Sequence, residues 1–306
     1  MRPPKGGPLK QRLIIVSGKG GVGKSSVAAA LALSFARNGE RTLLCEINAQ
    51  ARAASLLGHP EVGAQLEEVE KNLWCVDVHP PDALKEYVLM TIKFERVYRA
   101  VFENRLVKYF LRFLPSLQEL VMLGKLLFHV REKLPNGQPR FDRVVMDAPA
   151  TGHAVAFLSV PQVLLDTVPA GPLATDVTWM RDMLVDPEVT AGVLVSLPEE
   201  MPVNETLELA QAFADKLHIQ VTDVVLNCAV SARFSAGELA ALTAHPALEV
   251  LARGYEQRVR MSEDAKTQLG AVGVPLVEVP RLFTPEFTRE SLLQMAEALR
   301  PLWEGG

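Results

Sequence analysis

The sequence of 306 residues has few cysteines, no surplus of positive charge and no long apolar run. Its three cysteines, Cys45, Cys75 and Cys228, are too few and too far apart for a disulfide framework or a CxxC-type zinc site within one chain. We therefore expect a reducing compartment, the cytoplasm. The net charge of -4 supplies no basic field for a phosphate backbone, which argues against nucleic acid as a partner.

No segment reaches the ~18 uninterrupted apolar residues of a membrane-spanning helix. Asp166 and several prolines interrupt the best candidate, residues 154–173. The sequence therefore predicts a chain without a direct membrane span. Residues 1–12 are basic and rich in proline and glycine, and the apolar run after them is too short for a signal-peptide core. We expect these twelve residues to form a flexible arm.

Short segments that are apolar throughout alternate with longer helical patterns along the chain. Continuous apolar strands are typical of a sheet that is buried on both faces, and strand–helix alternation indicates parallel connections. The pattern predicts a doubly wound, mostly parallel α/β sheet. The expected strands are residues 13–16, 42–47, 73–78, 143–146, 192–196, 224–226 and 275–279.

A long, mostly helical segment separates the third and fourth expected strands. A parallel crossover needs only about a dozen residues, so residues from about 83 to 135 are interpreted as a helical subdomain inserted into a single domain of residues 13–306. Its many aromatic side chains are interpreted mainly as core, with a groove for a partner as the alternative.

A glycine-rich loop follows the first expected strand. Residues 18–25 match G-x-x-x-x-G-K-[ST] between a strand and a helical pattern, the context in which this motif binds phosphates. Its backbone N–H groups would surround the β-phosphate of ATP, Lys24 would reach the β- and γ-phosphate oxygens, and Ser25 would ligate Mg²⁺. The expected ATP-binding residues are Gly20, Gly21, Val22, Gly23, Lys24, Ser25 and Ser26.

The loop contains a second lysine, Lys19, in the string KGGVGKS. This string resembles the deviant Walker A signature of the ATPases that include the nitrogenase iron protein, the cell-division-site and chromosome-partitioning ATPases, and the arsenite-pump and tail-anchored-protein-targeting ATPases. In that family the signature lysine crosses a nucleotide-sandwiched dimer to the partner's phosphates. The resemblance implies a dimer and a catalytic role in trans for Lys19; the alternative is a solvated lysine.

The fourth expected strand ends in Asp147, followed by APATGH and, four residues later, by FL. By itself, an acid after an apolar strand fits a residue that holds a Mg²⁺-bound water, so Ser25 and Asp147 are the expected metal residues. The longer string resembles switch II of the arsenite-pump and tail-anchored-targeting branch, and the likeness covers most of the chain.

Two further groups are assigned to the adenine base through this resemblance. Asn227 ends an expected strand where the family has an asparagine that reads the adenine edge, a task that suits an amide because it donates and accepts at once. The alternative is an asparagine that caps the strand in a turn. Pro280 and Arg281 belong to the loop that is expected to cover the base.

The sequence departs from the family at switch I. Where the family usually has an acid that helps to deprotonate the attacking water, this chain has Asn48, and an amide is not a base. Loss of a catalytic base typically removes about 10²–10⁴-fold in rate, so we expect slow hydrolysis. Glu46 points the same way by strand alternation. It is interpreted either as a substitute acid or as a helper of the switch loop.

The sequence also lacks the features through which members of this branch bind a client protein or arsenite. Between residues 161 and 193 we expect only a brief connection, where targeting members carry long Met-rich helices, and we interpret Met180 and Met183 beside Trp179 as core. The scattered cysteines offer no thiolate cluster for arsenite. The client therefore stays undefined by the sequence.

The sequence as a whole predicts a cytoplasmic, dimeric, Mg²⁺-dependent ATPase of this branch, which couples nucleotide-driven closure to an unknown protein client or partner. The dimer would be a homodimer or a heterodimer with a related ATPase. A first alternative, favoured by Asn48, is a regulatory subunit that binds nucleotide but hardly hydrolyses it. A second, a P-loop kinase acting on a small molecule, is disfavoured by Lys19 and the TGH string.

Overall fold

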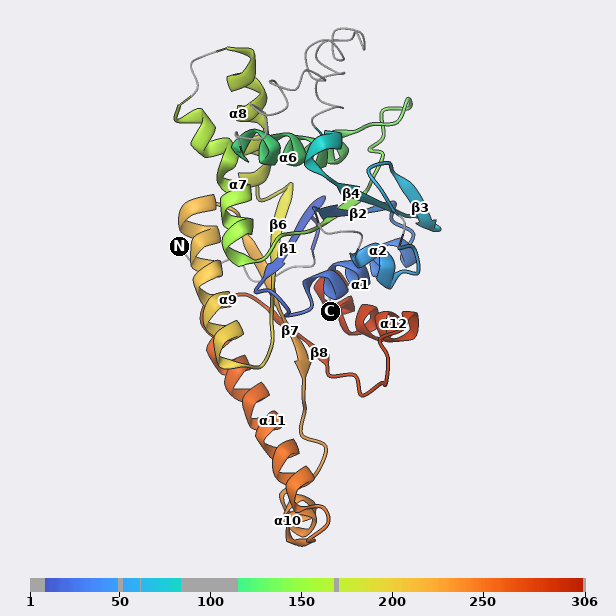
Figure 1. Ribbon diagram of the computed structural model, residues 1–306, viewed down its shortest axis with the longest axis vertical. Helices are drawn as coiled ribbons and strands as arrows, with labels where there is room; N and C mark the ends of the chain where they lie inside the picture. The colour runs from blue at the N-terminus through green and yellow to red at the C-terminus, as the bar shows by residue number, and fades with distance from the viewer. Residues whose placement is uncertain (1–8, 49–51, 61, 84–114, 168–170, 305–306) are drawn as a thin grey trace.

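The computed structural model describes residues 9–48, 52–60, 62–83, 115–167 and 171–304. Its centre is an eight-stranded sheet in the order β3-β4-β2-β5-β1-β6-β7-β8, parallel except for the β3–β4 pair (Figure 1). The strands are β1 (Leu13–Gly18), β2 (Thr42–Ile47), β3 (Glu67–Glu70), β4 (Leu73–Val78), β5 (Arg143–Asp147), β6 (Thr190–Ser196), β7 (Val221–Ala229) and β8 (Leu276–Pro280).

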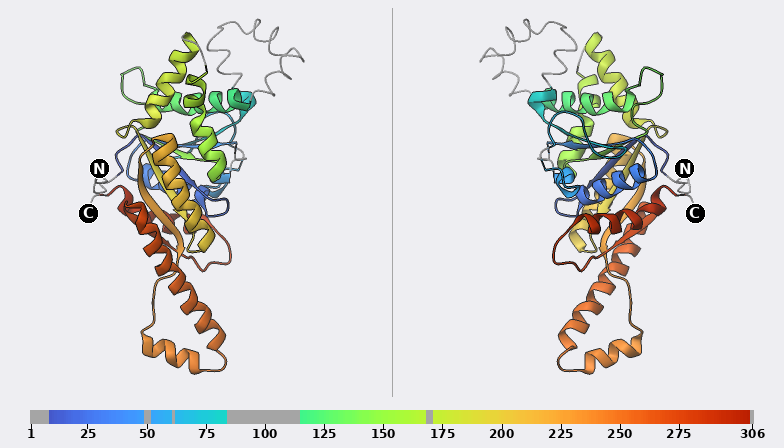
Figure 2. Two further views of the ribbon diagram at one scale, coloured as in Figure 1. Left: turned by 90° about the vertical axis from the view of Figure 1, so that its left-hand side faces the viewer. Right: turned by 90° about the vertical axis from the view of Figure 1, so that its right-hand side faces the viewer.

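The predicted fold class is confirmed, and all seven expected strands are present. Strand β3 was not predicted, because its sequence EEVE is acidic and lies partly exposed at the sheet edge, without the apolar run that marks the other strands. Helices cover both faces of the sheet (Figures 1 and 2). The helices are α1 (Lys24–Arg37), α2 (Arg52–Leu56), α6 (Pro115–Arg131), α7 (Thr151–Leu165), α8 (Pro172–Val185), α9 (Glu200–Ala212), α10 (Ala236–Ala244), α11 (Glu249–Leu269) and α12 (Arg289–Ala298).

Two layers of buried apolar side chains lie on opposite faces of the sheet. In β1, Leu13 and Ile15 join the layer that α6, α7, α8, α9 and α11 cover, while Ile14 and Val16 join the layer under α1, α2 and α12. Successive side chains of a strand point to opposite faces. This alternation explains why the strand sequences are mostly apolar at successive positions, with Glu46 in β2 and Asp77 in β4 as buried exceptions.

The segment between α7 and β6 corrects one expectation. Instead of a brief connection, it contains α8, a helix of 14 residues that packs on α6 and α7. Met180 is buried in the core cluster, and Trp179 and Met183 pack against that cluster, which confirms their interpretation as core. The helix was missed because its polar residues interrupt the apolar pattern at Asp176 and Asp182.

Helix α6 is the described part of the expected helical subdomain. Its residues Leu123, Leu126 and Leu127 are fully buried against the sheet layer. Residues 84–114, with the aromatics Tyr87, Phe94, Tyr98, Phe102, Phe110 and Phe113, lie outside the described residues. The division of the chain into a single domain with a helical subdomain stays a prediction.

The described residues of the expected N-terminal arm lie against the body. The Leu9 side chain is buried, and its backbone N–H donates to the Leu302 carbonyl at 2.8 Å. The Arg12 guanidinium donates to the Val130 carbonyl at 3.2 Å. Residues 1–8 lie outside the described part of the chain.

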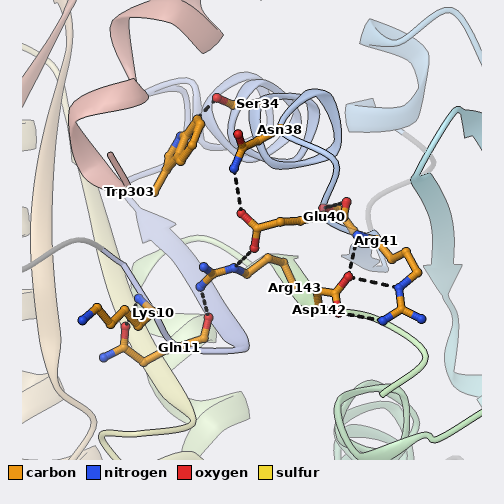
Figure 3. A network of polar contacts seen from close by, with 10 residues as sticks. Lys10, Gln11, Ser34, Asn38, Glu40, Arg41, Asp142, Arg143 and Trp303 are labelled. Carbon is orange, nitrogen blue, oxygen red and sulfur yellow. Dashed lines mark hydrogen bonds and ion pairs between the residues drawn. The ribbon is translucent and has the colours of Figure 1, made fainter. Parts of the chain in front are cut away.

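At the amino edge of the sheet, a polar network ties the starts of three strands together (Figure 3). Arg41 forms an ion pair with Asp142 at 2.7 Å, and Arg143 forms one with Glu40 at 2.6 Å. Arg143 also donates to the Gln11 carbonyl at 2.8 Å. These contacts join the residues before β1 and β2 to the beginning of β5.

Helix α10 and the start of α11 form a hairpin that projects from the body, away from α6 and α8, while the rest of α11 packs on α9 and β7 (Figures 1 and 2). Helix α10 buries none of its residues. In the described parts of the chain, no helix combines the length and the apolar character that crossing a membrane requires.

Candidate functional site

The candidate site is a pocket of about 690 Å³ at the carboxyl edge of the sheet. Strands β1, β2 and β5 are parallel neighbours, so the loops that leave them converge at this edge. The lining residues are Gly20, Gly21, Gly23, Lys24, Ser25, Ser26, Ile47, Asn48, Arg52, Glu119, Met122, Asp147, Ala148, Pro149, Ala150, His153 and Phe157. The structure thus brings together three groups that were predicted separately: the phosphate loop, the switch I position and the switch II acid.

The loop between β1 and α1 has backbone dihedral angles that glycine adopts readily. Gly21 and Gly23 adopt φ values of 87° and 90°, in the left-handed region. At Gly23 a Cβ atom would lie 2.4 Å from Nδ2 of Asn227, so the site also requires a residue without a side chain. Between these glycines, the buried Val22 side chain anchors the loop to the core.

Asn227, at the carboxyl end of β7, braces this loop. Its Nδ2 donates to the Val22 carbonyl at 2.9 Å, and its Oδ1 accepts from the Cys228 N–H at 2.9 Å. Asn227, Pro280 and Arg281 do not line the 690 Å³ pocket. Arg281 follows β8, where its N–H donates to the Ala229 carbonyl. Contact of these three residues with an adenine base stays a prediction.

Helix α1 begins directly after the loop with an open N-terminus. Its N-cap is Gly23, and no side chain caps the first turn. The N–H groups of that turn are therefore available to an anion. Lys24 points back over the loop, where its Nζ donates to the Lys19 carbonyl at 2.9 Å. Burial lowers the pKa of Lys24, and the nearby Asp147 carboxylate opposes this shift.

Ser25 and Asp147 form the polar pair at the base of the pocket. The Ser25 hydroxyl donates to Asp147 Oδ2 at 2.5 Å, while Oδ1 is buried without a hydrogen-bond partner in the described structure. Burial raises the pKa of Asp147, against the lowering effects of the Ser25 hydrogen bond and the Lys24 charge. A buried carboxylate oxygen without a partner is costly.

This pair fits Mg²⁺. The ion prefers oxygen ligands and is usually held by one or two protein groups together with phosphates and water. The described residues contain no group of three or more His, Cys, Asp or Glu side chains that could hold a metal alone. One hydroxyl and one carboxylate beside a phosphate-binding loop therefore suit a metal that arrives with a nucleotide.

Glu46 lies near the end of β2 but is fully buried. Its two carboxylate oxygens accept the backbone N–H groups of Ala53 and Ala54 at 2.7 and 3.0 Å, so it caps the short helix α2. Burial raises the pKa of Glu46 to about 7, although both hydrogen bonds lower it. With both oxygens occupied, Glu46 fits the helper of the switch loop better than the substitute acid.

Asn48 follows β2 and lines the pocket. Its φ of 53° lies in the left-handed region, which asparagine tolerates better than most residues. Its Oδ1 lies 3.2 Å from Nδ1 of His79, and Nε2 of His79 lies 3.0 Å from Oδ2 of the buried Asp77. No sequence motif pointed to His79. Its place directly after β4, the strand beside β2, was the available signal.

Lys19 forms an ion pair within its own chain. Its Nζ lies 2.6 Å from Oε1 of Glu205 on α9. The other oxygen of Glu205 accepts the Thr151 hydroxyl at 3.4 Å, at the start of α7. Glu205 thus connects the phosphate loop to the switch II helix. This contact was not predicted because Lys19 and Glu205 are far apart in the sequence, and Arg52 in the pocket was not predicted because it belongs to no local motif.

Comparisons with known proteins agree with this geometry. A family model described as anion-transporting ATPase matches residues 11–169, which contain the phosphate loop and both switch positions. The chain is 31% identical to the ATPase BagA of Mycobacterium tuberculosis over 236 residues, 75% of this chain and 68% of that protein. It is 23% identical to the ATPase GET3 of Kluyveromyces lactis over 262 residues, 74% of each chain. It is 24% identical to GET3B of Arabidopsis thaliana over 267 residues, 71% of this chain and 64% of that one.

Proposed function

The chain belongs to the anion-transporting ATPase family, which includes the arsenite-pump and GET3-type nucleotide-binding ATPases, and from this premise we propose that it is a Mg²⁺-dependent, dimeric ATPase that couples ATP-driven closure to a protein partner. Membership supports nucleotide binding and an ATPase domain. The metal, the dimer, the partner and the cytoplasmic location are parts of the proposal.

The observation that carries the proposal is the Ser25–Asp147 pair beneath the open N-terminus of α1. In the nucleotide complex, the loop N–H groups would hold the β-phosphate, and Lys24 would exchange the Lys19 carbonyl for phosphate oxygens. Ser25 and Asp147 would hold Mg²⁺, which neutralises phosphate charge when bound. The Asp147 Oδ1 atom would then gain the partner that it lacks.

The ion pair between Lys19 and Glu205 suggests what has to change when the proposed dimer forms. For Lys19 to reach the phosphates of a second subunit, it has to leave Glu205, which is also in contact with Thr151 of α7. Helix α7 packs on α6 and α8. Closure of the dimer would therefore act on α7 and, through it, on α8 and on α6, the described part of the expected helical subdomain.

A second candidate function is a regulatory subunit that closes on ATP but hydrolyses it very slowly. It is favoured by Asn48, whose amide lines the pocket where the family has an acid. Glu46 supports the same candidate, since both of its oxygens are engaged with α2. Such a subunit would form a heterodimer with a related ATPase that carries the acid.

The test is phosphate release from radiolabelled MgATP at several protein concentrations, with Lys24→Ala and Asn48→Asp beside the wild type. Lys266→Ala is the matched control, because Lys266 pairs with Glu263 and Glu278 outside the pocket. Release that rises more than linearly with concentration and is lost in Lys24→Ala supports the homodimeric ATPase. MgATP binding without release, with release restored by Asn48→Asp, supports the regulatory subunit. Binding that survives Lys24→Ala contradicts both.

A further inference from the structure

Three polar side chains form a chain that runs from the interior to the pocket. The Asp77 carboxylate is buried at the end of β4, His79 lies two residues further on, and Asn48 lies at the pocket wall. The contacts measure 3.0 Å from Asp77 Oδ2 to His79 Nε2 and 3.2 Å from His79 Nδ1 to Asn48 Oδ1. The imidazole ring therefore bridges a carboxylate and an amide.

The backbone fixes this arrangement. Strands β2 and β4 are parallel neighbours in which Glu46 pairs with Asp77 and Ile47 with Val78. The Asn48 N–H continues the ladder by donating to the Val78 carbonyl at 3.0 Å. His79 and Asn48 are thus adjacent because the strands end side by side, and the left-handed turn at Asn48 carries its side chain to the pocket.

The chemistry of the bridge couples the ring to the amide. A carboxylate only accepts hydrogen bonds, so His79 Nε2 carries a hydrogen toward Asp77. When the ring is neutral, Nδ1 has only a lone pair and must accept from the Asn48 NH₂ group. When the ring is protonated, Nδ1 donates to Asn48 Oδ1, which is the pair of atoms that the structure places 3.2 Å apart. Rotation of the Asn48 amide group by about 180° exchanges the two states. In the first state Oδ1 is directed to the pocket, and in the second state the NH₂ group is.

We propose that His79, held by Asp77, is a positioning residue that sets which end of the Asn48 amide faces the nucleotide. The proposal rests on the proposed function, in which Asn48 lies next to the position of the attacking water. With the neutral ring, Asn48 Oδ1 faces the pocket and can accept a hydrogen bond from that water, orienting it as a glutamine does in GTPases. With the protonated ring, the NH₂ group faces the pocket and cannot accept.

A double-mutant cycle tests this role. The four proteins are the wild type, His79→Ala, Asn48→Asp and the double variant, each assayed for MgATP affinity and for phosphate release at saturating MgATP. In the wild-type background, His79→Ala is expected to change the release rate roughly tenfold, the scale of a lost orienting contact, with MgATP affinity changed less than about twofold. In the Asn48→Asp background the change is expected to shrink to less than about twofold, because both oxygens of a carboxylate accept and no end has to be chosen.

A merely structural His79 gives a different pattern. If the ring only supports the fold, His79→Ala costs the same factor in both backgrounds, and this outcome overturns the proposal. His245→Ala is the matched control, since His245 lies beyond the end of α10, outside the pocket lining, and no change is expected. Circular dichroism of each variant verifies that it is folded.

The contact is also measured without turnover, which separates this proposal from the proposed function. In protein labelled with ¹⁵N in its histidine rings, Asn48→Ala is expected to shift the His79 Nδ1 resonance. Asn136→Ala is the control and is expected to leave it unchanged, because Asn136 lies in an exposed turn where its side chain accepts the Gln138 N–H at 3.0 Å. A His79 resonance that ignores Asn48→Ala overturns the proposal even where no variant hydrolyses ATP. Failure of every variant to bind MgATP counts instead against the proposed function.

Discussion

The two edges of the central sheet hold charged residues under very different conditions. At the amino edge, Arg41 pairs with Asp142 and Arg143 with Glu40, and each side chain keeps some exposure to water (Figure 3). At the carboxyl edge, where β5 ends, Asp147 is buried and one of its oxygens has no hydrogen-bond partner among the described residues.

The pKa shifts follow the same division. The hydrogen bonds and charge of Arg41 lower the pKa of Asp142 in spite of some burial, so its carboxylate is stabilised where it stands. Burial raises the pKa of Asp147 and lowers that of Lys24, so both charged forms are disfavoured without a ligand. Polar groups held at a cost in free energy are typical of a binding site. The amino edge maintains the fold, and the carboxyl edge is prepared for a ligand.

The largest expected effect is that of Lys24→Ala at the carboxyl edge. We expect MgATP affinity to fall at least about 100-fold, because the phosphate oxygens lose a charge-assisted partner in a partly buried site. Isothermal titration calorimetry measures the affinity. Wild-type affinity in Lys24→Ala would mean that the pocket is not a phosphate site and that the comparison of the two edges fails.

Asp147→Asn separates binding from folding at the same edge. Without nucleotide, we expect the thermal midpoint to stay or rise, because the substitution removes a buried carboxylate while Ser25 can still donate to the amide oxygen. With MgATP, we expect phosphate release to fall about 100-fold through loss of the metal contact. Differential scanning calorimetry without nucleotide measures the first effect, and phosphate release from radiolabelled MgATP measures the second. A strong loss of stability without nucleotide would place Asp147 with the structural residues.

Glu46 predicts a dependence of stability on pH. Its folded-state pKa of about 7 lies above the ordinary value of 4.5. The folded state therefore binds this proton more tightly than the unfolded state, and the contribution of Glu46 to stability falls as pH rises between those values. In urea titrations at several pH values, the difference between wild type and Glu46→Gln should change across that window by about 1–3 kcal/mol. A constant difference would contradict the raised pKa.

The sequence predicts the structure best where a local pattern carries the physics. The seven expected strands are mostly apolar and, except for β8, largely buried, and Lys24, Ser25 and Asp147 lie in strings whose spacing fixes their chemistry. The roles of His79, Arg52 and Glu205 were not predicted, because they arise when distant segments meet. Glu205 is far from Lys19 in sequence, and only the packing of α9 beside the phosphate loop joins them.

Arg143→Ala examines the amino edge. The guanidinium pairs with Glu40, donates to the Gln11 carbonyl and lies 5.0 Å from the centre of the Phe35 ring. We expect the free energy of unfolding to fall by about 1–2 kcal/mol, since a largely buried, hydrogen-bonded charge pair is broken. MgATP affinity should remain unchanged. Urea denaturation and calorimetry on the same preparation check both results, and a weakened affinity would show that the two edges are coupled.

The smallest effect is expected from Glu205→Gln, which breaks the one ion pair of the signature lysine that the described structure contains. Both side chains are partly exposed, so the pair should contribute less than about 1 kcal/mol to stability. The same small free energy opposes any movement of Lys19 toward a second subunit. Glu205→Gln should therefore strengthen MgATP-dependent self-association by up to about fivefold.

Sedimentation velocity with MgATP and with MgADP measures this association. Glu208→Gln is the matched control, because Glu208 is exposed and lies about one helical turn after Glu205 on α9. This variant should leave the self-association unchanged. At the amino edge, removal of one member of a pair is expected only to weaken the fold. A gain in assembly on removal of Glu205 would show that an ion pair at the carboxyl edge restrains function, whereas weaker assembly would mean that Glu205 itself supports the dimer.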